Sequence, residues 1–219
     1  MSGTSLVIGS TGLIGKKLIF ELAKKDSEVI AITRRSISNL PENVTLLEIN
    51  FDDFLDNGSL PSCDHIYICL GTTIKKAGSQ SEFKKVDFDY SVSFARKARE
   101  AGATEISLVS SVGANPYSKN FYLKTKGEVE EEIKKIDFQS INIFRPSLLL
   151  GHREEGRFLE KIGQNLSSFI NPLLIGSLRK YRGIKSSNVA YFMANCEKSS
   201  GIKYFYFDDF NNNFERENQ

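Results

Sequence analysis

The chain has few of the residues that build covalent or metal-bound scaffolds. Its 219 residues include three cysteines, two histidines and no tryptophan. Three cysteines without a C-x-x-C spacing predict neither a disulfide framework nor a zinc site, and they fit a reducing compartment. No apolar run approaches the roughly 20 residues of a membrane helix, and the first run is too short for a signal-peptide core. We therefore expect no bound metal, no membrane segment and a cytoplasmic location.

Excess charge of either sign is also missing. Lysine and arginine number 29 against 27 acidic residues, a net charge of +2, so no strong field points toward nucleic acid. The hydrophobic share of 40% is ordinary for a globular protein. This length suits one compact domain, with at most a small subdomain.

The chain does contain a regular alternation of apolar runs and helix-like segments. The expected strands are residues 5–9, 28–33, 44–49, 65–70, 105–110 and 140–145. Helical patterns at 12–25, at 81–101 and from Phe121 onward separate several of them. Nearly continuous apolar strands that alternate with helices predict an α/β fold, a doubly wound parallel sheet with helices on both faces. Ligands of such sheets bind beyond the carboxyl ends of the strands.

The rhythm changes after Pro146. Residues 154–166 and 186–196 look helical, and residues 202–207 look like a strand. We interpret residues 1–146 as the sheet core. Residues 147–219 are expected to form a small C-terminal substrate lobe over the sheet's carboxyl edge, within one compact domain overall.

Three glycines stand at the first strand–helix junction. Gly9, Gly12 and Gly15 give G-x-x-G-x-x-G in "VIGSTGLIGKKL". Glycine permits a tight turn and close approach of a pyrophosphate, which the helix N-terminus then stabilises. The pattern predicts dinucleotide binding, with a packing turn as the alternative. The residues assigned to this contact are Gly9, Ser10, Thr11, Gly12, Leu13, Ile14 and Gly15.

The ends of the second and third strands indicate which dinucleotide binds. NAD-binding proteins usually place an acidic residue after the second strand, whereas this chain has Arg34 and Arg35. A guanidinium can hold a 2′-phosphate, which favours NADP over NAD. After the third strand, Asn50 and Phe51 stand where an adenine contact is expected. Asp52 is the alternative if the strand ends later.

The fourth strand ends in a glycine-containing turn. Leu70, Gly71 and Thr72 are expected to bring backbone close to the middle of the dinucleotide. Lys75 and Lys76 follow in a loop where plain solvation is the favoured interpretation.

A tyrosine and a lysine four residues apart lie on the helix that follows the fifth strand. The apolar positions of this helix are Val129, Ile133 and Ile136. Three residues before Val129 is Lys126, and four residues before Lys126 is Tyr122, so both are expected on the inward stripe. Ser110 and Ser111 lie at the carboxyl end of the fifth strand. A neighbouring ammonium favours the phenolate of a tyrosine, and a serine hydroxyl can orient a reacting carbonyl. A serine, Tyr122 and Lys126 together predict a proton-transfer site, with a chance Y-x-x-x-K pair as the alternative.

These motifs resemble the short-chain dehydrogenase/reductase superfamily, and more closely its atypical Tat-interacting-protein branch. The similar stretches are "CLGTT", "KAG", "VDFDY", "SSVGAN", "NFYLKTKGEVE" and "FRPSLLLG". The resemblance implies a Rossmann fold, NADP as cofactor and a catalytic triad. Tyr122 would be the acid/base, Lys126 would hold the nicotinamide ribose, and Ser111 would position the substrate. Pro146, in the last stretch, is added to the expected cofactor contacts.

Three functions remain open on the sequence. The first is an NADP-dependent oxidoreductase acting on a small carbonyl or hydroxyl substrate. The second is an NADP-binding regulatory or protein-interaction module with little turnover. The third is an epimerase or isomerase with retained cofactor, against which the short C-terminal lobe counts. A homodimer and a protein partner are also left open, and the residues expected to line a substrate site are Lys75, Asn115, Ser147, Arg153 and Arg157.

Overall fold

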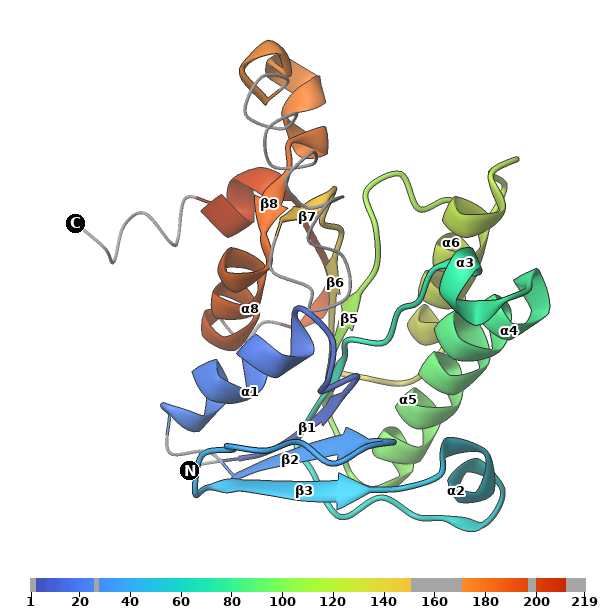
Figure 1. Cartoon of the computed structure of the whole chain (residues 1–219), viewed down its shortest axis with the longest axis vertical. Coiled ribbons are helices and arrows are strands. Elements are labelled where there is room, and N and C mark those ends of the chain that lie inside the picture. Colours follow the sequence, from blue (N-terminus) through green and yellow to red (C-terminus); the bar gives the residue numbers. More distant parts are fainter. Residues whose placement is uncertain (1–2, 26–27, 151–170, 197–199, 212–219) are drawn as a thin grey trace.

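A parallel sheet forms the centre of the protein (Figure 1). The computed structural model describes residues 3–25, 28–150, 171–196 and 200–211. Within these residues the main sheet has seven strands in the order β3-β2-β1-β4-β5-β6-β9, each parallel to its neighbours. The strands are β1 Thr4–Ile8, β2 Glu28–Thr33, β3 Val44–Glu48, β4 His65–Ile68, β5 Glu105–Val109, β6 Ser140–Phe144 and β9 Gly201–Phe205. The predicted doubly wound parallel sheet is confirmed.

The winding of the chain reverses between β1 and β4. The chain first runs outward through β2 and β3, and then crosses to the other side of β1 for β4, β5 and β6. Ile8 is in register with Ile32 of β2 and with Ile68 of β4, so the three carboxyl ends are level. Such a switch point is where open α/β sheets bind their ligands.

Helices cover both faces of this sheet (Figure 1). The helices of one face are α1 Gly15–Ala23 and α8 Ser186–Asn195, and those of the other are α2 Phe51–Asn57, α5 Tyr90–Glu100 and α6 Phe121–Lys134. Successive strand residues point to opposite faces, and in β1 Leu6 and Ile8 join one core cluster while Val7 joins the other. The strands are therefore apolar on both sides, which explains their continuous apolar runs.

The helix expected over residues 81–101 is divided. It consists of α4 Gln80–Lys84, a π-helical turn η1 over Lys85–Asp89, and α5. The short helix α3, Ile74–Ala77, precedes it. The sequence prediction missed α2, whose first turn is capped by Asn50: the side-chain oxygen accepts the N–H of Asp52 at 3.0 Å.

The segment after Pro146 is only partly a separate lobe. Its β9 extends the main sheet beside β6, and α8 packs on α1, where Lys17 Nζ lies 2.8 Å from Ser186 Oγ. We expected this segment over the carboxyl edge, but these elements belong to the core because their apolar residues complete one of its faces.

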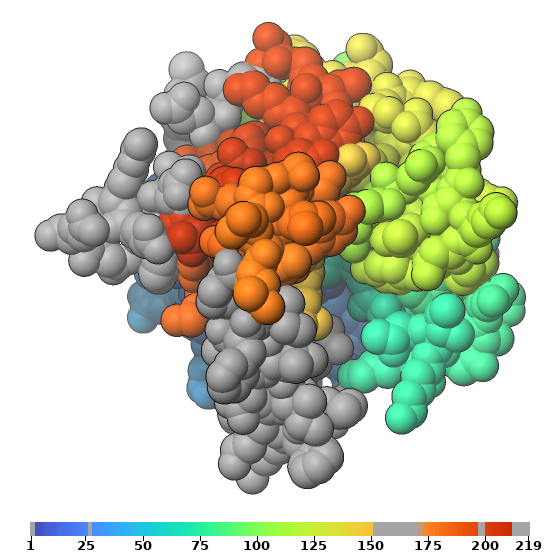
Figure 2. All heavy atoms as spheres, turned by 90° about the horizontal axis from the view of Figure 1, so that it is seen from above, coloured from blue at the N-terminus to red at the C-terminus, as the bar shows by residue number. Residues whose placement is uncertain are grey.

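The other described elements of this segment are smaller. A two-stranded sheet joins β7 Leu149–Leu150 to β8 Ile184–Lys185, and the 3₁₀ turns are η2 Asn171–Leu173 and η3 Gly176–Tyr181. Residues 171–185 (orange) occupy the centre of the face seen from above (Figure 2).

The helical pattern expected at 154–166 lies outside the described residues. In the described parts of the chain, no helix is long and apolar enough to cross a membrane, and no group of His, Cys, Asp and Glu could hold a metal ion.

Candidate functional site

The turn after β1 depends on glycine. Gly9 has φ +84°, and a Cβ at this position would lie 2.5 Å from the carbonyl oxygen of Cys69. A Cβ on Gly15 would lie 2.3 Å from the carbonyl oxygen of Gly9. Both contacts are with backbone, which cannot swing aside as a side chain does. The turn is therefore packed tightly between the end of β4 and the start of α1.

The start of α1 has the chemistry of an anion site. No side chain caps this helix, and its first turn contains no acidic residue. The first N–H groups of a helix lack intrahelical partners and carry partial positive charge, so they favour a phosphate. This end of α1 therefore fits the pyrophosphate of a dinucleotide.

Two of the residues expected to touch the cofactor here have their side chains turned inward. Ser10 Oγ donates to the carbonyl oxygens of Val7 at 2.7 Å and Ile32 at 3.2 Å, and Ile14 is in the core. Only their backbone is available to a ligand. Thr11 is exposed, and Gly12 and Leu13 are partly exposed.

The ends of β2 and β3 border an open hollow. Arg34, Glu48, Ile49 and Asn50 line this space of about 510 Å³. The Arg34 guanidinium lies 5.4 Å from the centre of the Phe51 ring. That ring is 2% exposed and packs against other aromatic rings of the core, so Phe51 is not presented to the hollow. Arg35 is exposed but is not among the lining residues.

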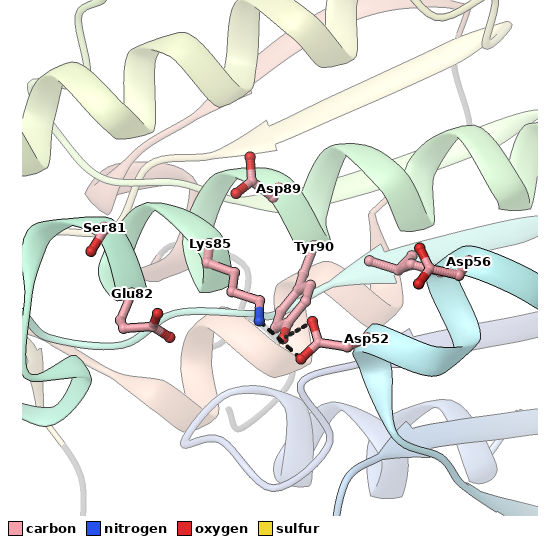
Figure 3. A pocket seen from close by; sticks show the side chains of 8 residues that line it. Asp52, Asp56, Ser81, Glu82, Lys85, Asp89 and Tyr90 are labelled. Carbon is pink, nitrogen blue, oxygen red and sulfur yellow. Dashed lines mark hydrogen bonds and ion pairs between the residues drawn. The ribbon is translucent and has the colours of Figure 1, made fainter.

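Asn50 and Asp52, the two candidates for the adenine contact, line different hollows. Asp52 faces a second hollow of about 380 Å³, where its carboxylate accepts from Lys85 Nζ at 2.9 Å and from the Tyr90 hydroxyl at 2.8 Å (Figure 3). The hydrogen bonds from Lys85 and Tyr90 lower the pKa of Asp52. Asn50 lines the hollow that Arg34 borders, and Arg34 also contributes to the lowered pKa of Asp52.

Helix α6 presents its lysine to the interior, as its sequence pattern predicts. The helix begins after Asn120, whose side chain accepts the N–H of Leu123 at 3.1 Å. Lys126 is 5% exposed, Tyr122 is half-buried, and Lys124 on the outer side is exposed. The expected inward direction of Lys126 is confirmed.

Lys126 has a buried partner that we did not predict. Its Nζ lies 2.7 Å from Oδ1 of Asp87, which is 1% exposed. Burial alone would lower the pKa of Lys126, but Asp87, together with Tyr122 and Glu130, outweighs this effect and raises the pKa above its ordinary value of 10.5. The ion pair with Asp87 therefore favours the charged ammonium form of Lys126.

The end of β4 lies against this ion pair. The backbone N–H of Thr72 donates to Asp87 Oδ2 at 2.9 Å. A Cβ on Gly71 would lie 3.9 Å from Lys126 Nζ and from Asp87 Oδ1. Gly71 is exposed, whereas Leu70 is buried in the core. Of the three predicted residues, Gly71 and Thr72 thus border the lysine.

The loop after β5 contains Ser111 and contacts the same helix further along, at Asn115. The N–H of Val112 donates to the carbonyl oxygen of Pro146 at 2.9 Å, which joins the ends of β5 and β6. The loop then lies on α6 at Gly127, where a Cβ would be 2.3 Å from the carbonyl carbon of Asn115. Ser111, Pro146 and α6 are thereby held at one edge of the sheet.

A second buried ion pair lies one helical turn beyond Lys126. Glu130 is 1% exposed and accepts from the Ser110 hydroxyl and from Arg145, whose Nε is 3.0 Å from Glu130 Oε1. Arg145 also donates to the Tyr206 hydroxyl at 3.0 Å. The sequence analysis missed Glu130, although its spacing of four from Lys126 puts it on the same stripe.

The residues expected to line a substrate site are scattered. Lys75 and Asn115 are exposed, and the Asn115 side chain accepts the N–H of Tyr117 at 2.9 Å. The Ser147 hydroxyl donates to the carbonyl oxygen of Arg182. Arg153 and Arg157 lie outside the described residues. Of these candidates, Asn115 lies against α6, where its backbone contacts Gly127 beside Lys126.

Comparison with known proteins supplies the family. The sequence model described as "NAD dependent epimerase/dehydratase family" matches residues 5–212. The chain belongs to the NAD dependent epimerase/dehydratase family. It therefore has an NAD(P)-binding Rossmann fold, as the glycine motif and the sheet predict.

Individual relatives confirm the resemblance to the Tat-interacting-protein branch. Protein HTATIP2 of Rattus norvegicus is 34% identical over 157 residues, covering 69% of this chain and 64% of the relative. "Protein FMP52, mitochondrial" of Candida albicans is 33% identical over 186 residues, covering 81% of each chain. The expected cytoplasmic location is wrong on this comparison, because several relatives have names that contain "mitochondrial". Composition and cysteine usage could not make this distinction.

Solved structures agree on the fold. Human epimerase family protein SDR39U1, solved with NADPH, has a TM-score of 0.63 at 18% identity, covering 93% of this chain and 74% of its own. UDP-N-acetylglucosamine 4-epimerase from Bacillus cereus has a TM-score of 0.67 at 18% identity, covering 99% and 84%. MoeE5, solved with UDP-glucose and NAD, has a TM-score of 0.65 at 16% identity, covering 93% and 76%. One of these neighbours was solved with NADPH and another with NAD, and at such low identity the likeness shows the fold alone.

Proposed function

We propose that the protein is an NADP-dependent oxidoreductase acting on a small carbonyl or hydroxyl compound. The observation that carries the proposal is the buried Lys126 ammonium beside Gly71 and Thr72, one helical turn from Tyr122. A charged lysine is costly to bury, and its place at the ligand-binding edge of the sheet favours a role in holding a ligand.

Each residue of the site has a distinct task in this proposal. The nicotinamide cofactor supplies hydride chemistry when bound. Lys126 donates hydrogen bonds to ribose hydroxyls. Tyr122 exchanges a proton with the substrate oxygen, and Ser111 orients that oxygen by a hydrogen bond.

Arg34 supports NADP as the preferred cofactor. Its guanidinium borders the hollow at the ends of β2 and β3, where an adenosine ribose is expected. A guanidinium can bind a 2′-phosphate through paired, charge-assisted hydrogen bonds. Glu48 lines the same hollow, and its carboxylate would repel that phosphate. The preference for NADP therefore depends on the phosphate lying closer to Arg34 than to Glu48.

Fluorescence titration with NADPH and NADH tests the cofactor assignment. Replacing Lys126 by Ala should weaken the binding of both cofactors by about 10- to 100-fold, since a hydrogen bond to a charged group contributes about 1.5–3 kcal/mol. Arg34→Ala should weaken NADPH by a similar factor and leave NADH unchanged. Lys124→Ala, on the exposed side of the same helix, is the control. Equal binding of the two cofactors by the native protein would refute NADP selectivity.

Turnover is tested on a panel of small aldehydes, ketones and alcohols. Tyr122→Phe should abolish turnover and keep NADPH affinity, because the ring remains and only the hydroxyl is lost. Full activity of Tyr122→Phe on a substrate of the native protein would exclude the assigned acid/base.

The description of the family includes epimerases, so an epimerase is the alternative function. An epimerase would retain its cofactor through purification and show no net change of cofactor absorbance during turnover. Release of free oxidised cofactor in proportion to product would exclude that alternative. The names of the fungal relatives support a mitochondrial location, which cell fractionation with antibody detection would test.

A further inference from the structure

The helix formed by α4 and η1 packs against α6, and two of its residues have the same spacing as Tyr122 and Lys126. Phe83 and Asp87 are four residues apart, as Tyr122 and Lys126 are. The rings of Phe83 and Tyr122 lie 5.8 Å apart, and Asp87 Oδ1 lies 2.7 Å from Lys126 Nζ. Phe83 is fully buried. Two neighbouring turns of one helix therefore contact two neighbouring turns of the other.

Asp87 lies within the π-helical turn η1. Turns of this kind are rare and occur often at functional sites. The two carboxylate oxygens of Asp87 have different partners: Oδ1 faces Lys126, and Oδ2 accepts the N–H of Thr72 at 2.9 Å. One buried carboxylate thus joins the end of β4, the π-helical turn and α6.

We propose that Asp87 is a positioning residue that holds the Lys126 ammonium, charged and in one place, toward a vicinal diol at the end of β4. The inference rests on the function proposed above and names the contact that prepares the lysine for its ligand. An ammonium has three N–H donors, and the one directed at Asp87 leaves two for a pair of hydroxyl groups. The ribose of a dinucleotide carries such a pair.

The charged surroundings of Lys126 give the inference a measurable signature. The titratable groups that act on it are Asp87 on η1, Tyr122 and Glu130 on α6, and Cys69 at the end of β4. Burial lowers the pKa of Lys126, and Asp87 is the largest influence in the opposite direction. Without this carboxylate the lysine should lose its proton at a lower pH than it does in the native protein.

The test is the pH dependence of NADPH affinity, measured by fluorescence between pH 6 and about pH 10, below the ordinary pKa of lysine. Native protein should keep its affinity across this range, because the raised pKa keeps Lys126 charged. Asp87→Asn should bind about 10-fold more weakly at pH 6, and the deficit should grow as the pH rises. Asp89→Asn removes an equal charge from an exposed position of the same turn and should behave like the native protein.

Two further variants separate positioning from folding. Asp87→Glu keeps the charge and should restore the flat pH profile, even if its affinity is lower. In a Lys126→Met background, Asp87→Asn should cause no further loss of affinity, because Asp87 acts through the lysine. Circular dichroism of each variant checks that the helices are retained.

The outcomes are distinguishable. If native protein binds neither NADPH nor NADH, the proposed function fails and the inference fails with it. If native protein binds NADPH but Asp87→Asn has the same pH profile as Asp89→Asn, the inference alone is overturned. If Asp87→Asn does not fold, the Asp87→Glu variant decides. The inference is overturned if the NADPH affinity of Asp87→Glu falls as the pH rises, although position 87 still carries a negative charge.

Discussion

Replacing Glu130 by Gln should destabilise the protein far more than any exposed charge change on the same helix. Gln has nearly the same shape as Glu but no charge, so the Arg145 guanidinium loses its counter-ion. Burial lowers the pKa of Arg145, but the hydrogen bond and charge of Glu130 outweigh it and raise that pKa above its usual range. Arginine remains charged even without such a partner, so in the variant the guanidinium must be solvated within a largely buried site.

The magnitude follows from the burial of the two side chains. Removing one partner of a buried ion pair costs about 3–5 kcal/mol. The Glu130 side chain is 2% exposed and that of Arg145 is 19% exposed, so water can partly solvate the guanidinium. The contacts of Arg145 with Tyr204 and Tyr206 also remain. We expect the lower end, about 3 kcal/mol, which is roughly 6–12 °C in Tm for a chain of this size.

Thermal and urea unfolding, followed by far-ultraviolet circular dichroism, measure this difference. The matched control is Glu131→Gln, since Glu131 makes a surface pair with Lys134 at 2.6 Å and its side chain is 47% exposed. Such a pair contributes about 0–1 kcal/mol. A Glu130→Gln variant that melts within 2 °C of Glu131→Gln, a margin of roughly 1 kcal/mol or less, would refute the reasoning. In a double-mutant cycle with Arg145→Met, the two losses should sum to at least 1 kcal/mol more than the loss of the double variant, an estimate of about the size seen for contacting residues.

Two other predictions concern backbone packing and the thiols. Gly127→Ala adds helix propensity worth about 1 kcal/mol, but its Cβ would overlap the Asn115 backbone, and overpacking costs about 1–3 kcal/mol. We expect a net loss of stability and of Tyr122-dependent turnover, and a raised Tm would contradict the packing. Burial raises the pKa of Cys63 to about 11 and of Cys69 to about 12. Both thiols should react slowly with a disulfide reagent at pH 8 in native protein and rapidly in urea; equal rates would show that they are accessible.

The pKa shifts of the thiols also fix the sign of a pH effect on stability. The unfolded thiols ionise near the ordinary value of 9.0, whereas the folded ones stay protonated until the pH approaches their raised pKa. Their contribution to stability is therefore present below pH 9.0 and is lost as the pH rises toward 11. Cys63→Ala should reduce the fall in stability over this interval.

Periodicity made the fold and the direction of Lys126 predictable. The strands were recognisable because residues buried on both faces must be apolar without a break, and this constraint is visible locally in the sequence. Lys126 was recognisable because it is in register with Val129 and Ile133, which the core requires. Both inferences use only neighbours within one element.

The partners of the site residues could not be predicted in this way. Asp87 precedes Lys126 by 39 residues, and Arg145 follows Glu130 by 15, so each pair depends on how different elements pack. A local signal did exist: Asp87 follows Phe83 by four residues on an otherwise apolar stripe. A charged residue in that place indicates a buried partner but does not identify it. The end of β3 was predicted to within one residue, but helix α2, which Asn50 caps, escaped prediction.

The two buried ion pairs together explain why the Tyr122–Lys126 stripe has one orientation. Asp87 holds α6 from the side of η1, and Arg145 holds it through Glu130 from the end of β6. Rotation of α6 by one residue, about 100°, would break both pairs and leave buried charges without partners. Apolar packing alone would tolerate small rotations, since hydrophobic contacts are not directional. The charged pairs therefore give this edge of the sheet the fixed geometry that the proposed proton-transfer site requires.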